Sequence, residues 1–185
     1  MNRRRLQVVL AVGLLSLFAA VGVAAAGGWG GDKFRERLTG YEETPLALST
    51  PASGEFDVRI SRFADEIDYE LSYRGFPTDV TQAHIHFGAR AQSGGISVWL
   101  CANNPPIMTA PPGTQACPTR EGEIEGEITA EDVVGPTGQG ISAGEFDELI
   151  DAVRAGATYV NVHTVERGAG EIRAQIEDRD RGRGD

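Results

Sequence analysis

The chain has 185 residues, with 17 Lys and Arg side chains against 27 Asp and Glu side chains, and its net charge is −10 at pH 7. Such an excess of negative charge argues against nucleic acids and anionic membrane surfaces as partners, because both repel an acidic protein. The length suits one domain with a core of its own.

The amino terminus has the pattern of an export signal. Arg3, Arg4 and Arg5 precede an apolar run over residues 6–26, which ends in Ala24-Ala25-Ala26. A basic start, an apolar stretch and an Ala-x-Ala end are typical of a cleaved secretory signal peptide. We therefore expect residues 1–26 to be removed, leaving a protein that is secreted or held at the cell surface or in the periplasm, with no membrane contact. An uncleaved membrane anchor and twin-arginine export are the alternatives.

Apolar residues at every second position recur through the mature chain. This period is typical of strands with one buried face. Such strands are predicted within the segments 56–60, 67–73, 96–100, 124–128 and 172–176. Turn-forming stretches rich in Gly, Pro and Ser separate them. The sequence therefore predicts a single all-β, antiparallel sandwich or barrel over residues 27–176.

Two cysteines lie in a segment rich in Pro, Asn and Thr. Cys101 and Cys117 are the two cysteines of the chain, and an exported protein meets an oxidising compartment that favours their pairing. We expect one disulfide that closes a long loop and stabilises the domain by about 3 kcal/mol. A pair of free thiols is the alternative.

Three further patterns concern the second half of the chain. Glu121, Glu123, Glu125 and Glu127 alternate, which is typical of the solvated face of an edge strand, although a calcium surface is the alternative. One short helix is predicted from a capping box at Ser142 and Glu145 and from the helical spacing of Phe146, Leu149, Ile150 and Val153, with Gly156 as its end signal. The charged tail, residues 177–185, is expected to be disordered.

The three histidines of the chain fall in two predicted strands, Ala83-His84-Ile85-His86-Phe87 and Val160-Asn161-Val162-His163. Alternate side chains of a strand share a face. If the apolar residues face the core, all three histidines lie on the outer surface of their sheets.

A metal site is one interpretation of these histidines. Two histidines spaced two apart on a strand are about 6.6 Å apart at Cα, so His84 and His86 can reach one ion, and His163 from a neighbouring strand would be a third ligand. Three imidazoles with an open position suit zinc or copper. The alternative is a surface pair hydrogen-bonded to local backbone. No nucleophile motif such as Gly-x-Ser-x-Gly is present and neither cysteine has a basic setting, so the sequence gives no catalytic residues.

A hairpin is predicted to bring more polar residues to the face of His163. Gly168-Ala169-Gly170 would form its turn, and the alternation that buries Ile172 and Ala174 puts Glu171, Arg173 and Gln175 beside His163 and Asn161. We expect Arg173 to pair with Glu171 or another carboxylate and to orient the outer face. Guidance of an anion toward a bound metal is the alternative.

Together these segments resemble the CHRD (chordin) domain family from about Phe34 to Ile176. The resemblance depends on motifs that occur in order: Leu38-Thr39-Gly40-Tyr41-Glu42-Glu43-Thr44-Pro45, Leu71-Ser72-Tyr73, Ala83-His84-Ile85-His86-Phe87-Gly88, Tyr159-Val160-Asn161-Val162-His163-Thr164 and Gly170-Glu171-Ile172-Arg173-Ala174-Gln175. The insertion that carries Cys101 and Cys117 and the charged tail depart from the family pattern.

The resemblance implies an immunoglobulin-like β-barrel similar to copper/zinc superoxide dismutase, without an established enzymatic activity. In that enzyme copper is held outside the barrel by a His-x-His strand and a later strand ending in Val-His, and His84, His86 and His163 match these roles. The bridging fourth ligand and the zinc ligands have no counterpart here. The resemblance thus favours a non-catalytic extracellular module that binds a protein or matrix component, and a mononuclear copper or zinc protein is the alternative.

Overall fold

The computed structural model describes residues 31–103 and 110–178. The predicted signal peptide and most of the predicted charged tail lie outside these residues. The described part contains eight strands and one α-helix: β1 (Lys33–Thr39), β2 (Ser53–Ile60), β3 (Ile67–Arg74), β4 (Val80–Phe87), β5 (Gly95–Ala102), β6 (Gly122–Ile128), α1 (Phe146–Arg154), β7 (Thr158–Thr164) and β8 (Ile172–Ile176). The prediction of an all-β fold with one short helix is confirmed. Within these ranges no helix has the length and apolar character needed to cross a bilayer.

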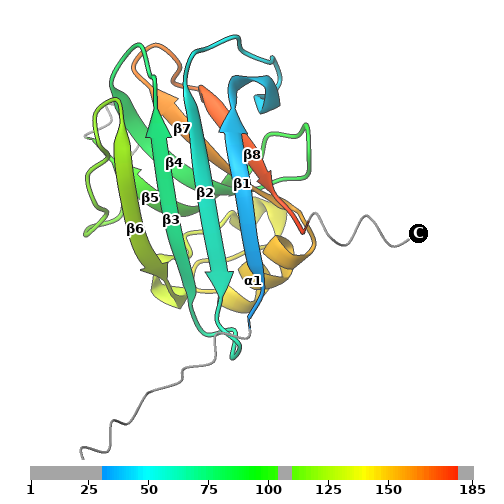
Figure 1. Cartoon of the computed structure of the whole chain (residues 1–185). Helices are drawn as coiled ribbons and strands as arrows, with labels where there is room; N and C mark the ends of the chain where they lie inside the picture. Colours follow the sequence, from blue (N-terminus) through cyan, green and yellow to red (C-terminus); the bar gives the residue numbers. More distant parts are fainter. Residues whose placement is uncertain (1–30, 104–109, 179–185) are drawn as a thin grey trace, which may run out of the picture.

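The eight strands form one antiparallel sheet in the order β5-β4-β7-β8-β1-β2-β3-β6. Figure 1 shows the sheet folded on itself, with β1, β2, β3 and β6 in front and β4, β5, β7 and β8 behind. The two end strands, β5 and β6, approach each other, and the Tyr69 hydroxyl on β3, next to β6, donates to the Leu100 carbonyl on β5 at 3.3 Å. The sheet is therefore a nearly closed barrel.

The barrel interior is apolar because alternate residues of every strand point into it. The core contains side chains that are at most 1% exposed from both layers, among them Phe56, Leu71, Ile85, Val160 and Ile172. Helix α1 adds Leu149 and Ile150 to the same core. It lies behind the lower ends of β1 and β2 in the view of Figure 1.

The start of α1 differs from the prediction. The helix begins at Phe146 with Glu145 as its N-cap residue, instead of being capped by Ser142. Glu145 folds back so that its carboxylate accepts the Ser142 backbone N–H at 2.6 Å. The N-cap residue is thus three positions later than predicted. At the other end, Gly156 lies just beyond the helix with a φ of 67°, as expected of a glycine that ends a helix.

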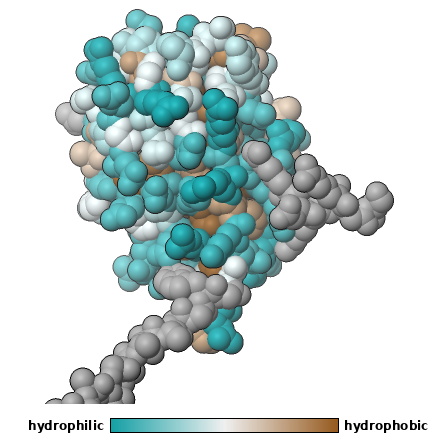
Figure 2. Space-filling view, viewed as in Figure 1, coloured by the Kyte–Doolittle hydropathy of each residue, from teal (hydrophilic) through white to brown (hydrophobic). Residues whose placement is uncertain are grey.

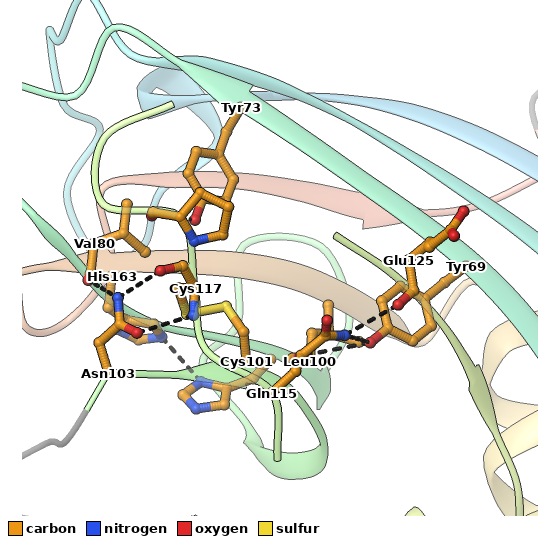
Figure 3. Close-up of a disulfide and its surroundings, with 12 residues drawn as sticks. Tyr69, Tyr73, Val80, Leu100, Cys101, Asn103, Gln115, Cys117, Glu125 and His163 are labelled. Atoms are coloured by element: carbon orange, nitrogen blue, oxygen red, sulfur yellow. Dashed lines mark hydrogen bonds between the residues drawn. A yellow bond between two sulfur atoms is a disulfide. The ribbon is translucent and has the colours of Figure 1, made fainter. Parts of the chain in front are cut away.

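A disulfide holds the seam between β5 and β6 and confirms the predicted pairing. Cys101 at the end of β5 is bonded to Cys117, with the two Cα atoms 5.0 Å apart. Figure 3 shows the Asn103 side chain bonded to the same loop, where it donates to the Cys117 carbonyl at 2.8 Å and accepts the Cys117 N–H at 2.9 Å. The loop before β6 is therefore attached to β5.

The outer face of β1, β2, β3 and β6 is hydrophilic, as Figure 2 shows from the viewpoint of Figure 1. Glu123, Glu125 and Glu127 on β6 are exposed, and β6 pairs with β3 at one end of the sheet order. This confirms the solvated edge strand expected from the alternating glutamates.

Candidate metal centre

The structure brings the three histidines together on the back layer of the barrel. His84 and His86 come from β4 and His163 from β7, which are neighbours in the sheet. One ligand nitrogen from each ring lies within 4.8 Å of the other two. The β4–β5 register shifts next to His84 and again next to His86, and such bulges re-aim side chains.

The three rings are buried, which differs from the expected position on an outer surface. They do lie on the strand face opposite the core residues Ala83 and Ile85, but their exposed fractions are only 1% for His84, 8% for His86 and 6% for His163. Strand alternation predicts the face correctly. It does not include the loops and aromatic side chains that cover this face.

Aromatic rings and two backbone carbonyls enclose the histidines. The His84 ring meets the Trp99 ring edge-on, with centroids 4.2 Å apart. The His86 ring is stacked on Tyr159, with centroids 4.7 Å apart and planes 2° from parallel. Trp99 on β5 pairs with His84, and Tyr159 on β7 pairs with His86. Neither contact was predicted, because the sequence alone does not give the register between strands.

Hydrogen bonds determine where the ring protons lie. His86 Nδ1 is 3.0 Å from the Gly94 carbonyl, and His163 Nδ1 is 3.0 Å from the Gly168 carbonyl. A carbonyl can only accept, so both Nδ1 atoms carry the proton and both Nε2 atoms are unprotonated, each with a lone pair that can accept a hydrogen bond or bind a metal. The backbone hydrogen bonds of the alternative interpretation are therefore present, but in a buried cluster instead of at the surface.

Burial keeps all three rings neutral. It lowers the pKa of His84 to about 2, with smaller effects from the charges of His163 and His86. It also lowers the pKa of His86 and of His163, each to about 4. The rings are thus deprotonated at neutral pH, the state in which histidine binds metal.

Two ring nitrogens of the cluster lack a partner. Among the described residues, neither His84 Nε2 nor His86 Nε2 makes a hydrogen bond. Buried polar atoms without a partner cost free energy. A bound metal ion would supply that partner. Two ligand atoms that are each about 2.1 Å from one ion are at most about 4.2 Å apart. The ligand nitrogens of the three histidines lie within 4.8 Å of one another, so they need to move together only slightly to bind one ion.

Arg173 lies beside the cluster, but the prediction that it pairs with a carboxylate is wrong. The guanidinium is buried and lies 3.4 Å from the centre of the Tyr159 ring. It donates to the Thr44 hydroxyl at 2.6 Å and forms no ion pair within 4.0 Å among the described residues. A loop from far along the chain supplies its partner, which strand alternation could not predict.

The other predicted neighbours form a separate buried polar group. Asn161 donates to the Glu43 carboxylate at 2.7 Å, whereas Glu171 accepts from the hydroxyls of Thr50 and Thr164, each at 2.7 Å. Burial raises the pKa of Glu43 to about 7, although Arg173 acts in the opposite direction. No role was predicted for Glu43, although it lies in the first motif of the family resemblance.

A family model describes most of this chain. The model of the CHRD domain matches residues 34–176, a range that includes all eight strands except the first residue of β1, together with the histidine cluster. No curated protein and no solved structure matches the chain.

Proposed function

Because the chain belongs to the CHRD domain family over residues 34–176, we propose that this family member is a metal-binding module that holds one copper or zinc ion through His84, His86 and His163. One observation carries the proposal: three neutral imidazoles converge in a buried site, and two of their ring nitrogens have no partner. Neutral imidazole is a ligand of both copper and zinc.

The cluster has the features that distinguish a metal site from packed core histidines. His86 and His163 each donate Nδ1–H to a backbone carbonyl, which fixes the ring and directs Nε2 away from that carbonyl. Ligating histidines are commonly oriented in this way. His84 Nδ1 lies 3.2 Å from His163 Nε2, so the rings of the two strands meet directly.

We further propose that the module works outside the cytoplasm, in a secreted, cell-surface or periplasmic setting. The Cys101–Cys117 disulfide supports this, because such bonds persist in oxidising compartments. The export signal predicted from residues 1–26 points the same way.

Binding of an extracellular protein or matrix component is a second candidate function. The observation that favours it is the exposure of Tyr41 and Leu46, each 74% exposed, in the segment after β1 that also carries Glu43 and Thr44. Large exposed apolar side chains are candidate contacts for a partner. The Arg173–Thr44 hydrogen bond joins this segment to the neighbourhood of the histidines.

Calorimetric titration of the metal-free protein with copper and zinc salts tests the metal site. We expect one ion per chain in the wild type and a loss of binding by at least a hundredfold in His86→Ala and in His163→Ala. The double variant Glu125→Gln/Glu127→Gln is the matched control, because it removes exposed acidic groups that could hold cations nonspecifically. Equal binding in the histidine variants, or lost binding in the control alone, would contradict the proposal.

A further inference from the structure

The donor set of the cluster restricts which ion it can hold. The three ligands are neutral nitrogen atoms, and in the described ranges no fourth His, Cys, Asp or Glu joins them. Imidazole serves both oxidation states of copper as well as zinc. The donor type alone therefore does not choose the ion, but the number and charge of the donors do.

Zinc requires a fourth ligand, and no described His, Cys, Asp or Glu supplies one. Protein zinc is almost always four-coordinate, so three histidines leave a position that water or substrate must fill. Here the three rings are nearly inaccessible to solvent. The neighbouring surface hollow, lined by residues that include Glu43, Leu46, Gly168 and Gly170, reaches none of them. Cu(II) has a similar difficulty because it prefers a tetragonal set of four or more ligands.

The cost of burying charge also disfavours a divalent ion at this site. The cost of moving an ion from water into a buried site rises with the square of its charge, so a divalent ion costs about four times as much as a monovalent ion of the same size. No carboxylate belongs to the ligand group to offset that cost. A positive charge also acts on the cluster: Arg173 contacts Tyr159, which is stacked on His86, and its charge lowers the pKa of His86.

From these observations we infer that the site selects monovalent copper, Cu(I), over Zn(II) and Cu(II), and that Arg173 contributes to the selection as a positioning and charge-bearing neighbour. This inference rests on the proposed metal site and names its ion. Cu(I) accepts three nitrogen ligands without a fourth, carries a single charge and needs no bound water. Trp99 and Tyr159 enclose the ligands with apolar ring surface, which suits an ion of low charge.

Competition titrations of the folded, disulfide-bonded protein test the ion preference. Cu(I) is supplied without oxygen, with ascorbate as reductant so that Cys101–Cys117 stays intact, against a chromophoric Cu(I) chelator. Zn(II) and Cu(II) are titrated against chelators of their own. We expect Cu(I) to bind one to one and at least a hundredfold more tightly than Zn(II).

Arg173 variants test the contribution of charge. Arg173→Gln removes the positive charge, so we expect the preference for Cu(I) over Cu(II) to fall about tenfold, which equals a lowering of the one-electron potential by about 59 mV. Arg173→Lys keeps the charge and should keep the preference. Arg35→Gln is the matched control, because Arg35 is exposed and paired with Asp57 on the opposite layer.

The outcomes separate this inference from the proposed function. Binding of Zn(II) or Cu(II) at least as tight as that of Cu(I) would overturn the ion preference and leave the metal site intact. Absence of binding by all three ions would overturn both. An unchanged potential in Arg173→Gln, with the fold retained by circular dichroism, would remove Arg173 from the selection.

Discussion

His84 donates a hydrogen bond to His163 across the β4–β7 pair. The two atoms, His84 Nδ1 and His163 Nε2, are 3.2 Å apart. His163 uses its own ring proton on the Gly168 carbonyl, so its Nε2 must be the acceptor and His84 Nδ1 the donor. Binding of a metal at His163 Nε2 would therefore break this hydrogen bond.

Metal affinity should not depend on pH over a wide range. The pKa of His86 and of His163 is about 4, and that of His84 is lower still at about 2, so protons do not compete with the metal above about pH 5. We expect the dissociation constant to change less than about threefold between pH 7.5 and pH 5. Measurement by chelator competition at each pH checks this. A loss of affinity that begins near pH 6.5 would indicate exposed histidines with ordinary pKa values.

The metal-free domain should lose stability in acid. The three histidines have lower pKa values when folded than the ordinary value of 6.5, so below pH 6.5 the unfolded chain binds protons that the folded chain does not. Their contribution is complete above pH 6.5 and is lost as the pH falls toward 4. The free energy of unfolding should decrease by up to about 4 kcal/mol per pH unit from the three groups together. Guanidinium unfolding between pH 7 and pH 4.5 measures it.

Glu43 changes the stability in the opposite direction, and a variant of this residue tests whether its pKa is raised. Its pKa is raised to about 7 from 4.5, so the folded carboxyl keeps a proton between pH 4.5 and pH 7 and gains stability as the pH falls. It should offset about 1 kcal/mol per pH unit of the histidine effect. Glu43→Gln should therefore steepen the loss of stability in this window. Glu125→Gln, on an exposed edge, should leave the slope unchanged, and equal slopes in all three proteins would refute the Glu43 assignment.

Trp99 should report copper binding directly. Its ring is 4.2 Å from the His84 ring, and the chain has one other tryptophan, Trp29. In a Trp29→Phe protein, Cu(II) added until the site is saturated should quench most of the remaining emission, because a paramagnetic ion held by His84 would lie close to the Trp99 indole. Zn(II), a d¹⁰ ion without redox chemistry, should quench far less. Emission that stays constant while copper binds would place the ion elsewhere.

Gly94 should be required for the geometry of His86. Its carbonyl accepts from His86 Nδ1 and its N–H donates to the Tyr159 hydroxyl at 3.1 Å. A Cβ atom there would stand 1.7 Å from the Phe87 carbonyl oxygen, so Gly94→Ala must shift the backbone. We expect a loss of stability of about 1–3 kcal/mol and a tenfold to hundredfold loss of metal affinity. Gly138→Ala, where no atom lies within 4 Å of the added carbon, should change neither.

The sequence was sufficient for the strands and for the faces of their side chains. The alternation around Ile85 and Val162 correctly predicted that His84, His86 and His163 share the face opposite the core, and the export pattern with two cysteines predicted the disulfide. Both inferences use only neighbours in sequence or a single covalent pair. The helix start was displaced because Glu145, three positions after the predicted cap, took that position.

The burial of the histidine cluster could not be predicted from the local sequence pattern. The covering groups come from segments far apart in sequence, such as Gly94, Trp99 and Gly168, and a period of two carries no information about what packs on the outer face. The partner of Arg173 shows the same limit. The carboxylates near it in sequence bond elsewhere, and Thr44, which lies in the segment after β1, receives its guanidinium N–H. Long-range packing decided these contacts.

Metal analysis of the native protein tests the central claim most directly. The protein is purified from its native compartment without chelator, metal column or affinity tag, and its metal content is measured by inductively coupled plasma mass spectrometry beside a His84→Ala/His86→Ala/His163→Ala protein. We predict close to one copper or zinc ion per wild-type chain and none above background in the triple variant. A wild-type protein without bound metal, which also fails to take up copper or zinc in solution, would contradict the account.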